Sequence, residues 1–263
     1  MDLANASTIV TGGAGLLGSA CVKMLAERGA HVVVLDKAKD RFDELVERLG
    51  PLGAQLSLST ADVRDPQEVA DACTQAAAQG PLRVVISCAG WWWKMDRLLS
   101  RDGEVYPLDK FQEIIDVNIV GTYNVLCQAA KVMASQDPLD SDGQRGLVVN
   151  VASLAGLEGS AGQTAYGTAK AGVAGLTIPA ARDVGVLGIR VNCIAPNGMA
   201  AEGEVYETGS GYAVGDRILE QTPFPKRFGW PSEFARTCEW FIDTHYINGQ
   251  VIRLDGGGRL PLR

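Results

Sequence analysis

Residues 8–18 read Thr8-Ile9-Val10-Thr11-Gly12-Gly13-Ala14-Gly15-Leu16-Leu17-Gly18. The short apolar run at the start of this stretch predicts a strand, and the helical spacing of residues 16–28 predicts a helix directly after the glycines. Glycines permit a tight turn and the close approach of a ligand, while the helix N-terminus presents free N–H groups to a phosphate. The stretch therefore favours a dinucleotide-binding turn over an ordinary strand-to-helix turn.

The rest of the chain continues the alternation of strands and helices. Further apolar strands are predicted at residues 31–35, 55–60, 83–87, 146–151, 189–194 and 250–254. Helices are predicted at residues 41–49, 66–79, 108–135 and 161–185, and no linker or repeat interrupts the pattern. Apolar strands alternating with helices imply a parallel sheet covered on both faces. We therefore expect residues 1–263 to form a single doubly wound Rossmann-type α/β domain with a seven-stranded parallel sheet.

Composition excludes several classes of protein. Hydrophobic residues make up 46% and charged residues 21% of the chain, which is typical of a globular protein. The net charge of −7 argues against a nucleic-acid or anionic-membrane surface, although a local basic pocket stays open. No apolar stretch reaches the ~18 residues of a membrane span, and no signal peptide is expected.

Cysteine and histidine usage argues against a metal site. None of the six cysteines forms a C-x-x-C pair, and most lie in apolar runs, so we expect small buried side chains in a reducing, cytoplasmic compartment. The two histidines are far apart in the sequence, which gives little support to a histidine-based triad or metal cluster. These residues are Cys21, Cys73, Cys88, Cys127, Cys193, Cys238, His31 and His245.

Two aspartates follow predicted strands at the expected nucleotide site. Asp36 ends the second strand, eighteen residues after Gly18, where a carboxylate accepts hydrogen bonds from adenosine ribose hydroxyls. It would repel a 2′-phosphate, which favours NAD, although the following Lys37 keeps NADP open. Asp62-Val63 follows the third strand and is expected either to contact the adenine or to cap a helix.

A candidate proton-transfer site lies later in the chain. Tyr166 and Lys170 are four residues apart, so they share one face of a helix. A nearby positive charge favours the phenolate and lowers the tyrosine pKa. Ser153, thirteen residues before the tyrosine, is expected to hold the reacting oxygen against the phenol. The alternative is a solvated helix face without catalytic function.

Taken together, these residues resemble the short-chain dehydrogenase/reductase family. The resemblance covers the whole chain and rests on the glycine turn, Cys88-Ala89-Gly90, Asn118, Ser153, and Tyr166 with Lys170. It implies oxidation of alcohols or reduction of carbonyls with a nicotinamide cofactor, and it implies that Asn118 holds a water that relays protons to Lys170. The nucleotide-binding positions that it implies are Gly12, Gly15, Leu17, Asp36, Asp62, Val63, Cys88, Ala89, Gly90, Tyr166, Lys170, Pro196, Gly198 and Met199.

Three further segments narrow the resemblance to the subgroup of type 10 17β-hydroxysteroid dehydrogenase. They are residues 144–146, 177–183 and 247–256. This similarity implies an NAD-dependent homotetramer that oxidises 3-hydroxyacyl-CoA thioesters and accepts some steroids. It favours a CoA thioester over the alternative, a hydroxysteroid or another bulky secondary alcohol. The helices at residues 108–135 and 161–185 would pack across subunits, although their apolar stretches also fit a buried helix within one chain.

One segment departs from the family pattern. The stretch Pro196-Asn197-Gly198-Met199 inserts an asparagine after the proline, and no nearby threonine follows it. The departure puts the contacts on the nicotinamide side in doubt. It also supports an alternative of another class, a non-catalytic subunit that pairs with an active homologue in a hetero-oligomer.

The substrate pocket is expected beside three consecutive tryptophans. Trp91, Trp92 and Trp93 follow the fourth strand at the carboxyl edge of the sheet, where ligands bind. They favour either an aromatic or branched acyl group or, equally, a structural plug. Residues 199–222 are expected to form a mobile substrate loop. Further candidates for substrate contact are Gln163, Tyr206 and Tyr212.

Overall fold

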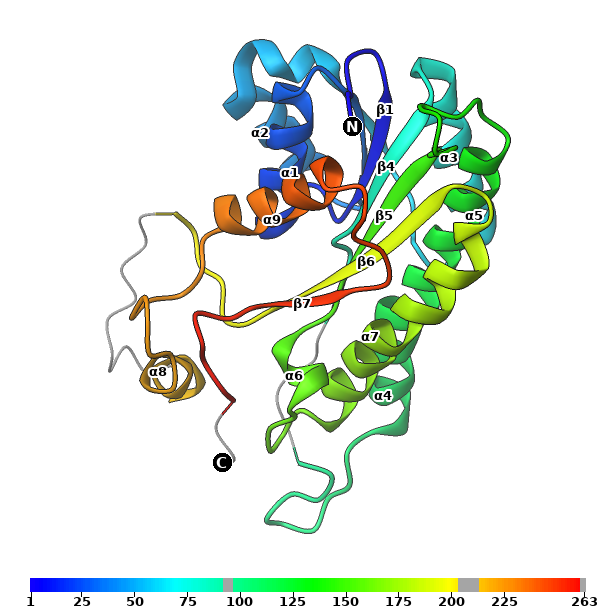
Figure 1. Cartoon of the computed structure of the whole chain (residues 1–263). Coiled ribbons are helices and arrows are strands. Elements are labelled where there is room, and N and C mark those ends of the chain that lie inside the picture. Colours follow the sequence, from blue (N-terminus) through cyan, green and yellow to red (C-terminus); the bar gives the residue numbers. More distant parts are fainter. Residues whose placement is uncertain (92–96, 203–212, 261–263) are drawn as a thin grey trace.

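The expected seven-stranded parallel sheet is confirmed. The computed structural model describes residues 1–91, 97–202 and 213–260, and its strands follow the order β3-β2-β1-β4-β5-β6-β7 (Figure 1). The strands are β1 (Ser7–Thr11), β2 (His31–Leu35), β3 (Leu56–Ser59), β4 (Leu82–Ser87), β5 (Gly146–Val151), β6 (Ile189–Pro196) and β7 (Val251–Leu254). The order reverses between β1 and β4, and a crevice that binds ligands opens at such a reversal.

Helices cover both faces of the sheet (Figure 1). One face carries α1 (Leu16–Glu27), α2 (Lys39–Leu49) and α9 (Pro231–Asp243). The other carries α3 (Pro66–Gln79), α4 (Leu108–Ile115), α5 (Gly121–Ala134) and α7 (Thr164–Gly185). The shorter helical elements are the 3-10 turn η1 (Gly50–Gln55), the π-helical η2 (Asp116–Val120), α6 (Leu154–Leu157) and α8 (Ala213–Glu220).

Side-chain alternation along the strands produces two cores. Val149 and Val151 of β5 pack toward α1 and α9, whereas Val148 packs toward α3, α5 and α7. Because successive strand residues point to opposite faces, apolar residues at every position bury both sides of the sheet. The sheet is thereby held rigid beneath the crevice.

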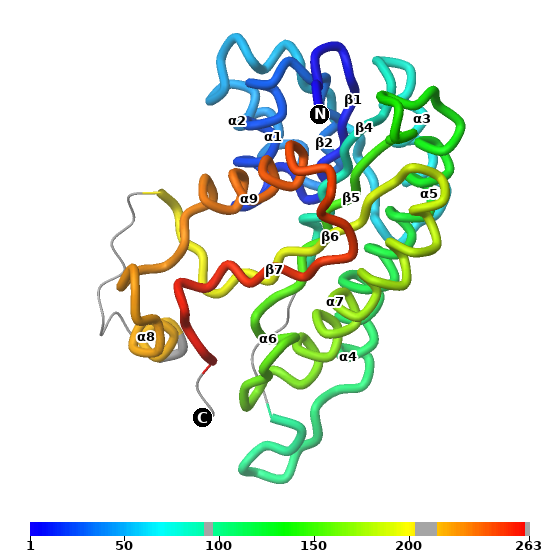
Figure 2. Tube along the Cα trace, in the orientation of Figure 1, coloured from blue at the N-terminus to red at the C-terminus, as the bar shows by residue number. Residues whose placement is uncertain are grey.

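The structure corrects three of the predicted elements. The helix predicted at residues 108–135 runs from α4 to α5, but the π-helical turn η2 interrupts it. The segment 199–222, predicted as a loop, includes the helix α8, seen beside the C-terminal segment in Figure 2. The helix α9 was not predicted, although Phe234 and Phe241 make it a major part of the core. No helix in the described ranges is both long and apolar enough to cross a membrane.

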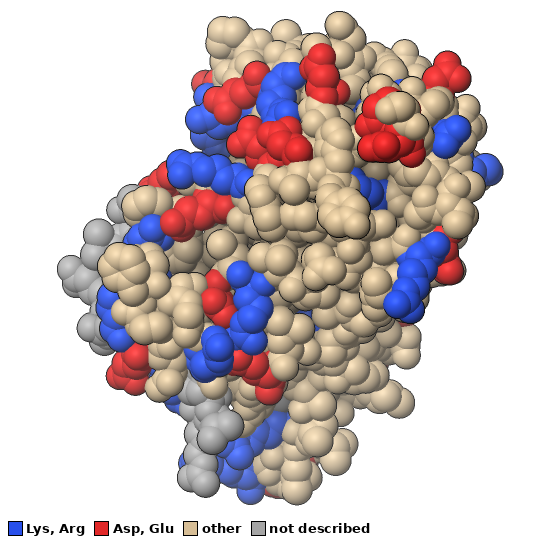
Figure 3. Space-filling view, in the orientation of Figure 1, with Lys and Arg blue, Asp and Glu red and all other residues tan. Residues whose placement is uncertain are grey.

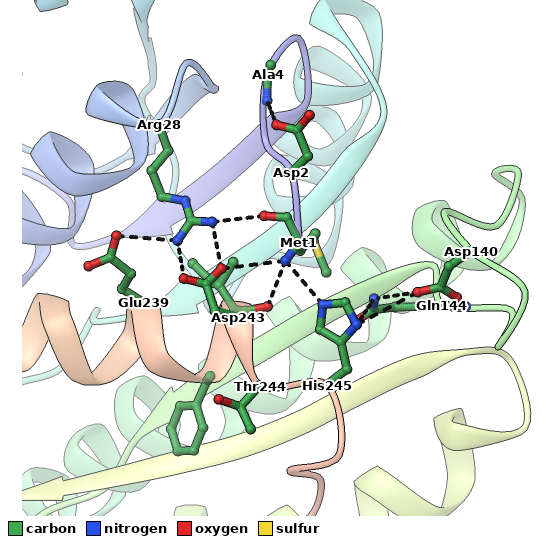
Figure 4. A network of polar contacts seen from close by, with 12 residues as sticks. Met1, Asp2, Ala4, Arg28, Asp140, Gln144, Glu239, Asp243, Thr244 and His245 are labelled. Atoms are coloured by element: carbon green, nitrogen blue, oxygen red, sulfur yellow. Dashed lines mark hydrogen bonds and ion pairs between the residues drawn. The ribbon is translucent and has the colours of Figure 1, made fainter.

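An arginine joins the far ends of α1 and α9. Arg28 donates hydrogen bonds of 2.6 and 2.8 Å to the two oxygens of Asp243, one of 3.3 Å to Glu239 and one of 2.9 Å to the Met1 carbonyl (Figure 4). This guanidinium lowers the pKa of the Asp243 carboxyl. Both helices end here, at the edge of the sheet opposite the crevice, so the contacts support the fold and leave the crevice free.

We predict that Phe241→Ala lowers the free energy of unfolding by about 3–5 kcal/mol, because it removes a fully buried ring and leaves a cavity. Denaturant unfolding measures the change. Phe224→Ala is the control, since that ring is 82% exposed, and it should cost far less. Equal losses for the two variants would contradict the place of α9 in the core.

Candidate active site

The glycine turn between β1 and α1 is built by close backbone packing. Gly12 has φ +59°, and a Cβ there would lie 2.9 Å from the Ala89 backbone. A Cβ on Gly18 would lie 2.2 Å from the Gly12 carbonyl oxygen. Neither position tolerates a side chain. Gly15 is the N-cap of α1, so the first free N–H groups of that helix open into the crevice.

The crevice holds a cavity of about 890 Å³ at the carboxyl ends of the strands. Nearly all of the predicted nucleotide-binding residues line it, together with Ser153 and Trp91. The lining members of the predicted set are Gly12, Gly15, Leu17, Asp36, Asp62, Val63, Cys88, Ala89, Gly90, Tyr166, Lys170, Pro196 and Met199. One cavity therefore joins the glycine turn to the tyrosine and lysine.

Gly198 is the exception among the predicted nucleotide-binding residues. It is not among the residues that line the cavity, and a Cβ on it would lie 2.4 Å from the Phe228 ring. A glycine is therefore needed at this position so that the Phe228 ring can pack against the backbone. The inserted Asn197 does line the cavity, and its amide lies 3.5 Å from the Thr222 hydroxyl.

Asp36 is held in place by the turn it faces. Its carboxylate is buried and accepts the N–H groups of Ala14 at 3.1 Å and of Ala38 at 3.0 Å. The Arg41 guanidinium lies 3.8 Å from the same carboxylate. The sequence analysis missed Arg41, which lines the cavity, because only the fold brings it back to the end of β2.

Asp62 is enclosed by two cations at the same end of the cavity. It pairs with Arg64 at 2.6 Å and also with Lys37. Hydrogen bonding to Arg64, with a further contribution from Lys37, holds the pKa of the Asp62 carboxyl far below its usual range. Lys37 is therefore engaged by a carboxylate. Arg64, like Arg41, is a cavity residue that the sequence analysis missed.

Ser153, Tyr166 and Lys170 come together as predicted. Ser153 is the N-cap of α6, and its hydroxyl accepts the Ala155 N–H at 3.2 Å. Tyr166 and Lys170 lie on α7, with the ammonium 5.7 Å from the centre of the phenol ring. The ammonium donates a hydrogen bond of 2.9 Å to the Val151 carbonyl of β5.

The pKa of the tyrosine differs from the predicted direction. Burial raises the pKa of the Tyr166 phenol, and the Ser153 side chain acts in the opposite direction. Burial also lowers the pKa of Lys170 to about 8. Removing both groups from water disfavours the charged form of each, and burial is the largest cause of both shifts.

Asn118 lies in the π-helical turn η2, on the other side of Gly90 from the lysine. Its side-chain N–H₂ donates to the Trp91 carbonyl at 2.6 Å and to the Ile114 carbonyl at 2.9 Å. Its Oδ1 atom is buried and accepts no hydrogen bond from the described residues. A Cβ on Gly90 would lie 3.0 Å from this oxygen and 3.4 Å from the Lys170 ammonium. Gly90 therefore keeps open the space between Asn118 and Lys170.

The predicted substrate residues divide into two groups. Trp91 lines the cavity and packs beside Ile114 and Ala165, with the Lys110 ammonium 5.9 Å from its ring centre. It therefore serves both as a cavity wall and as a structural plug. Gln163 precedes α7 and is not among the residues that line the cavity. The remaining candidates, Trp92, Trp93, Tyr206 and Tyr212, lie outside the described residues.

Comparison with known sequences identifies the family. The sequence profile described as short chain dehydrogenase matches residues 6–207. The chain belongs to the short-chain dehydrogenase family. This dehydrogenase is 37% identical to the 3-hydroxyacyl-CoA dehydrogenase type-2 of Rattus norvegicus, over 96% of this chain and 94% of the relative. It is 31% identical to the 3-oxoacyl-(acyl-carrier-protein) reductase FabG of Staphylococcus epidermidis, over 96% and 98%.

Solved structures agree with this assignment. The 3-hydroxyacyl-CoA dehydrogenase type-2 from Mycobacterium avium superposes with a TM-score of 0.90 at 40% identity, and 98% of each chain is covered. ElxO, solved with NADP bound, superposes with a TM-score of 0.82 at 26% identity, over 96% of this chain and 98% of ElxO. The short-chain dehydrogenase described here is therefore an oxidoreductase, and the expected similarity to 3-hydroxyacyl-CoA dehydrogenases is confirmed.

We predict that Gly90→Ala lowers kcat by about tenfold or more, because the added methyl group displaces Asn118 or Lys170 and small misplacements at a reacting centre are costly. Steady-state kinetics measures the loss. Gly175→Ala on α7 is the matched control, since a Cβ there meets no atom within 4 Å, and it should leave kcat unchanged. An unimpaired Gly90→Ala enzyme would contradict the packing between Asn118 and Lys170.

Proposed function

We propose that this chain interconverts a secondary alcohol and a ketone with NAD as the hydride acceptor. The observation that carries the proposal is the shared cavity, which joins the glycine turn and Asp36 to Ser153, Tyr166 and Lys170. A dinucleotide bound along this cavity would reach from the β1–α1 turn to the tyrosine. The nicotinamide ring supplies the hydride chemistry when bound.

The residues of the cavity fit NAD better than NADP. Gly12 and Gly15 line the cavity without side chains, which leaves the backbone of the turn open to a pyrophosphate. The fixed Asp36 carboxylate suits two ribose hydroxyls and repels a 2′-phosphate. The nearest cations are already engaged, Lys37 and Arg64 with Asp62 and Arg41 with Asp36. ElxO binds NADP, but the charges in this cavity favour the unphosphorylated coenzyme.

The side chains divide the proton chemistry between them. In alcohol oxidation, Ser153 holds the substrate hydroxyl and Tyr166 accepts its proton. Lys170, once charged, stabilises the phenolate that Tyr166 must form, which offsets the cost of burying the phenol. We assign Asn118 the positioning of a water that relays protons to Lys170, since its buried Oδ1 atom is available to accept a hydrogen bond.

A 3-hydroxyacyl-CoA is the substrate we propose. Two relatives are named 3-hydroxyacyl-CoA dehydrogenase and 3-oxoacyl-(acyl-carrier-protein) reductase. Both names describe an acyl thioester that carries oxygen at C3. Trp91 in the cavity wall favours an aromatic or branched acyl group. A hydroxysteroid is the alternative substrate, and a non-catalytic subunit of a hetero-oligomer is the alternative function. The intact set of Ser153, Tyr166 and Lys170 favours an enzyme over the subunit.

We also propose a cytoplasmic homotetramer. All six cysteines are free thiols, which fits a reducing compartment. Several large apolar side chains of the α4–α5 segment and α7 face solvent in the isolated chain, and burying them between copies would remove that surface from water. They are Leu108, Val120, Tyr123 and Ile178.

The experiment that tests the proposal is a steady-state assay of NADH or NADPH formation. The panel contains a straight-chain 3-hydroxyacyl-CoA, a phenyl-bearing 3-hydroxyacyl-CoA and a hydroxysteroid, each with NAD and with NADP. We expect turnover of a thioester, with kcat/KM for NAD exceeding that for NADP by about tenfold or more, since repulsion of one phosphate by Asp36 is worth at least that ratio. The ratio of kcat/KM between the two thioesters reports whether the tryptophans shape the pocket.

Tyr166→Phe is the control variant for the assay. Because it removes the proton-accepting group, kcat should fall by about 100-fold or more while NADH binding stays nearly unchanged. Turnover of the steroid alone would contradict the CoA assignment. Silence on all three alcohols, with NADH still bound, would favour the non-catalytic subunit.

A further inference from the structure

A row of side chains crosses the sheet directly below the catalytic residues. Ser87 of β4 pairs in register with Asn150 of β5, and Asn150 pairs with Cys193 of β6. Alternation along β5 places Asn150 on the face of Val148, which is the face that α5 and α7 cover. The same alternation places Ser87 on the face of Val85. Ser87 and Asn150 are therefore neighbours under the helices that carry the catalytic groups.

The polar side-chain atoms of Ser87 and Asn150 are buried without partners among the described residues. Ser87 is 2% and Asn150 0% exposed. The Ser87 hydroxyl and both polar atoms of the Asn150 amide make no hydrogen bond to the described part of the chain. Buried groups of this kind cost free energy unless they are hydrogen-bonded, and ordered water is the usual partner when protein atoms are not.

Lys170 contacts a residue next to this row. The ammonium bonds to the carbonyl of Val151, the residue after Asn150, and the thiols of Cys193 and of Cys88, the residue after Ser87, are close enough to influence its pKa. Besides these two thiols and the Tyr166 phenol on its own helix, no titratable group in the described ranges influences the ammonium. Within the described ranges the ammonium donates one hydrogen bond, to the Val151 carbonyl.

The spacing of the row suits water. Adjacent strands lie about 4.8 Å apart, close to the separation of two groups that one water bridges with hydrogen bonds of about 2.8 Å. A buried water needs two to four polar partners. The Ser87 hydroxyl and the two polar atoms of the Asn150 amide supply them.

We infer that Ser87 and Asn150 bind ordered water beneath Lys170 and act as positioning residues for the catalytic lysine. Neither residue touches substrate or coenzyme. The bound water supplies the buried ammonium with hydrogen bonds that the protein does not, and so helps to keep Lys170 charged beside Tyr166. The catalytic consequence rests on the proposed function, whereas the water site does not.

A crystal structure of the wild-type protein at about 1.5 Å resolution or better tests the water site without any assay. The expected result is at least one ordered water bonded to the Asn150 amide and the Ser87 hydroxyl. A row that is dry, or in which Ser87 and Asn150 bond only to each other, would overturn the inference. This result stands whether or not the protein oxidises alcohols.

The pH dependence of kcat/KM for alcohol oxidation tests the positioning role. Asn150→Leu and Ser87→Ala remove water ligands, so Lys170 loses its charge more readily and the Tyr166 phenolate is less stabilised. Oxidation needs the deprotonated phenol, so the acid limb of the profile should move to higher pH, by about one unit for Asn150→Leu. Ser7→Ala, which removes a buried hydroxyl at the opposite end of the sheet, should leave the limb unmoved.

An unmoved acid limb in both variants, with the wild type active, would overturn the positioning role. Should Asn150→Leu fail to fold, the more conservative Ser87→Ala and the crystal structure still decide. A wild type that oxidises no alcohol in the panel would defeat the proposed function and with it the positioning role, and the ordered water would then be judged from the crystal structure alone.

Discussion

The buried ammonium of Lys170 is the constraint on which the site depends. Removing a cation from water is costly, and here burial lowers the pKa of the lysine to about 8. The Val151 carbonyl supplies a hydrogen bond, and the surrounding backbone is kept close by glycines. A Cβ on Gly156 would lie 2.5 Å from the backbone of Lys170, so α6 and α7 pack in direct contact. Ser153, at the start of α6, is fixed relative to Tyr166 by that packing.

The parallel sheet brings the parts of the site together. The carboxyl ends of β1, β4, β5 and β6 supply the glycine turn, Gly90, Ser153 and Pro196 to one cavity. Acidic and basic side chains are interspersed on the face shown in Figure 3. Arg253 and Glu158 form an ion pair that ties β7 to the end of α6. Around the cavity, Asp36 and Asp62 form local ion pairs at one end, whereas the Lys170 ammonium lies at the reactive end.

Local sequence signals predicted the fold because they act over a few residues. The glycines after β1 form the predicted turn. The i, i+4 spacing places Tyr166 and Lys170 together on α7, as expected from the sequence. The helix α9 was missed although Phe234, Cys238 and Phe241 recur at helical spacing, and Trp230 is an unusual residue before a helix. The π-helical turn around Asn118 depends on packing between elements, which no short window of sequence contains.

The ion pairs and pKa shifts of the site were harder to predict from the sequence than the positions of its residues. Arg41 reaches the cavity from α2 because the chain turns back after β2, whereas Arg64 directly follows the predicted Asp62-Val63 and could have been named from that position. Likewise, the spacing predicted that Lys170 lies beside Tyr166, but it did not reveal that burial shifts the pKa of both groups. Which effect dominates a pKa is set by the number of surrounding atoms that exclude water. That number is a property of the tertiary structure.

The most direct test of the account is a crystal structure of the protein with NAD bound. We expect the pyrophosphate on the β1–α1 turn, the adenosine ribose hydroxyls on Asp36, and the nicotinamide ring beside Tyr166 and Lys170. A dinucleotide whose nicotinamide lies away from Tyr166, or one held outside this cavity, would contradict the claim that one cavity serves both coenzyme binding and proton transfer.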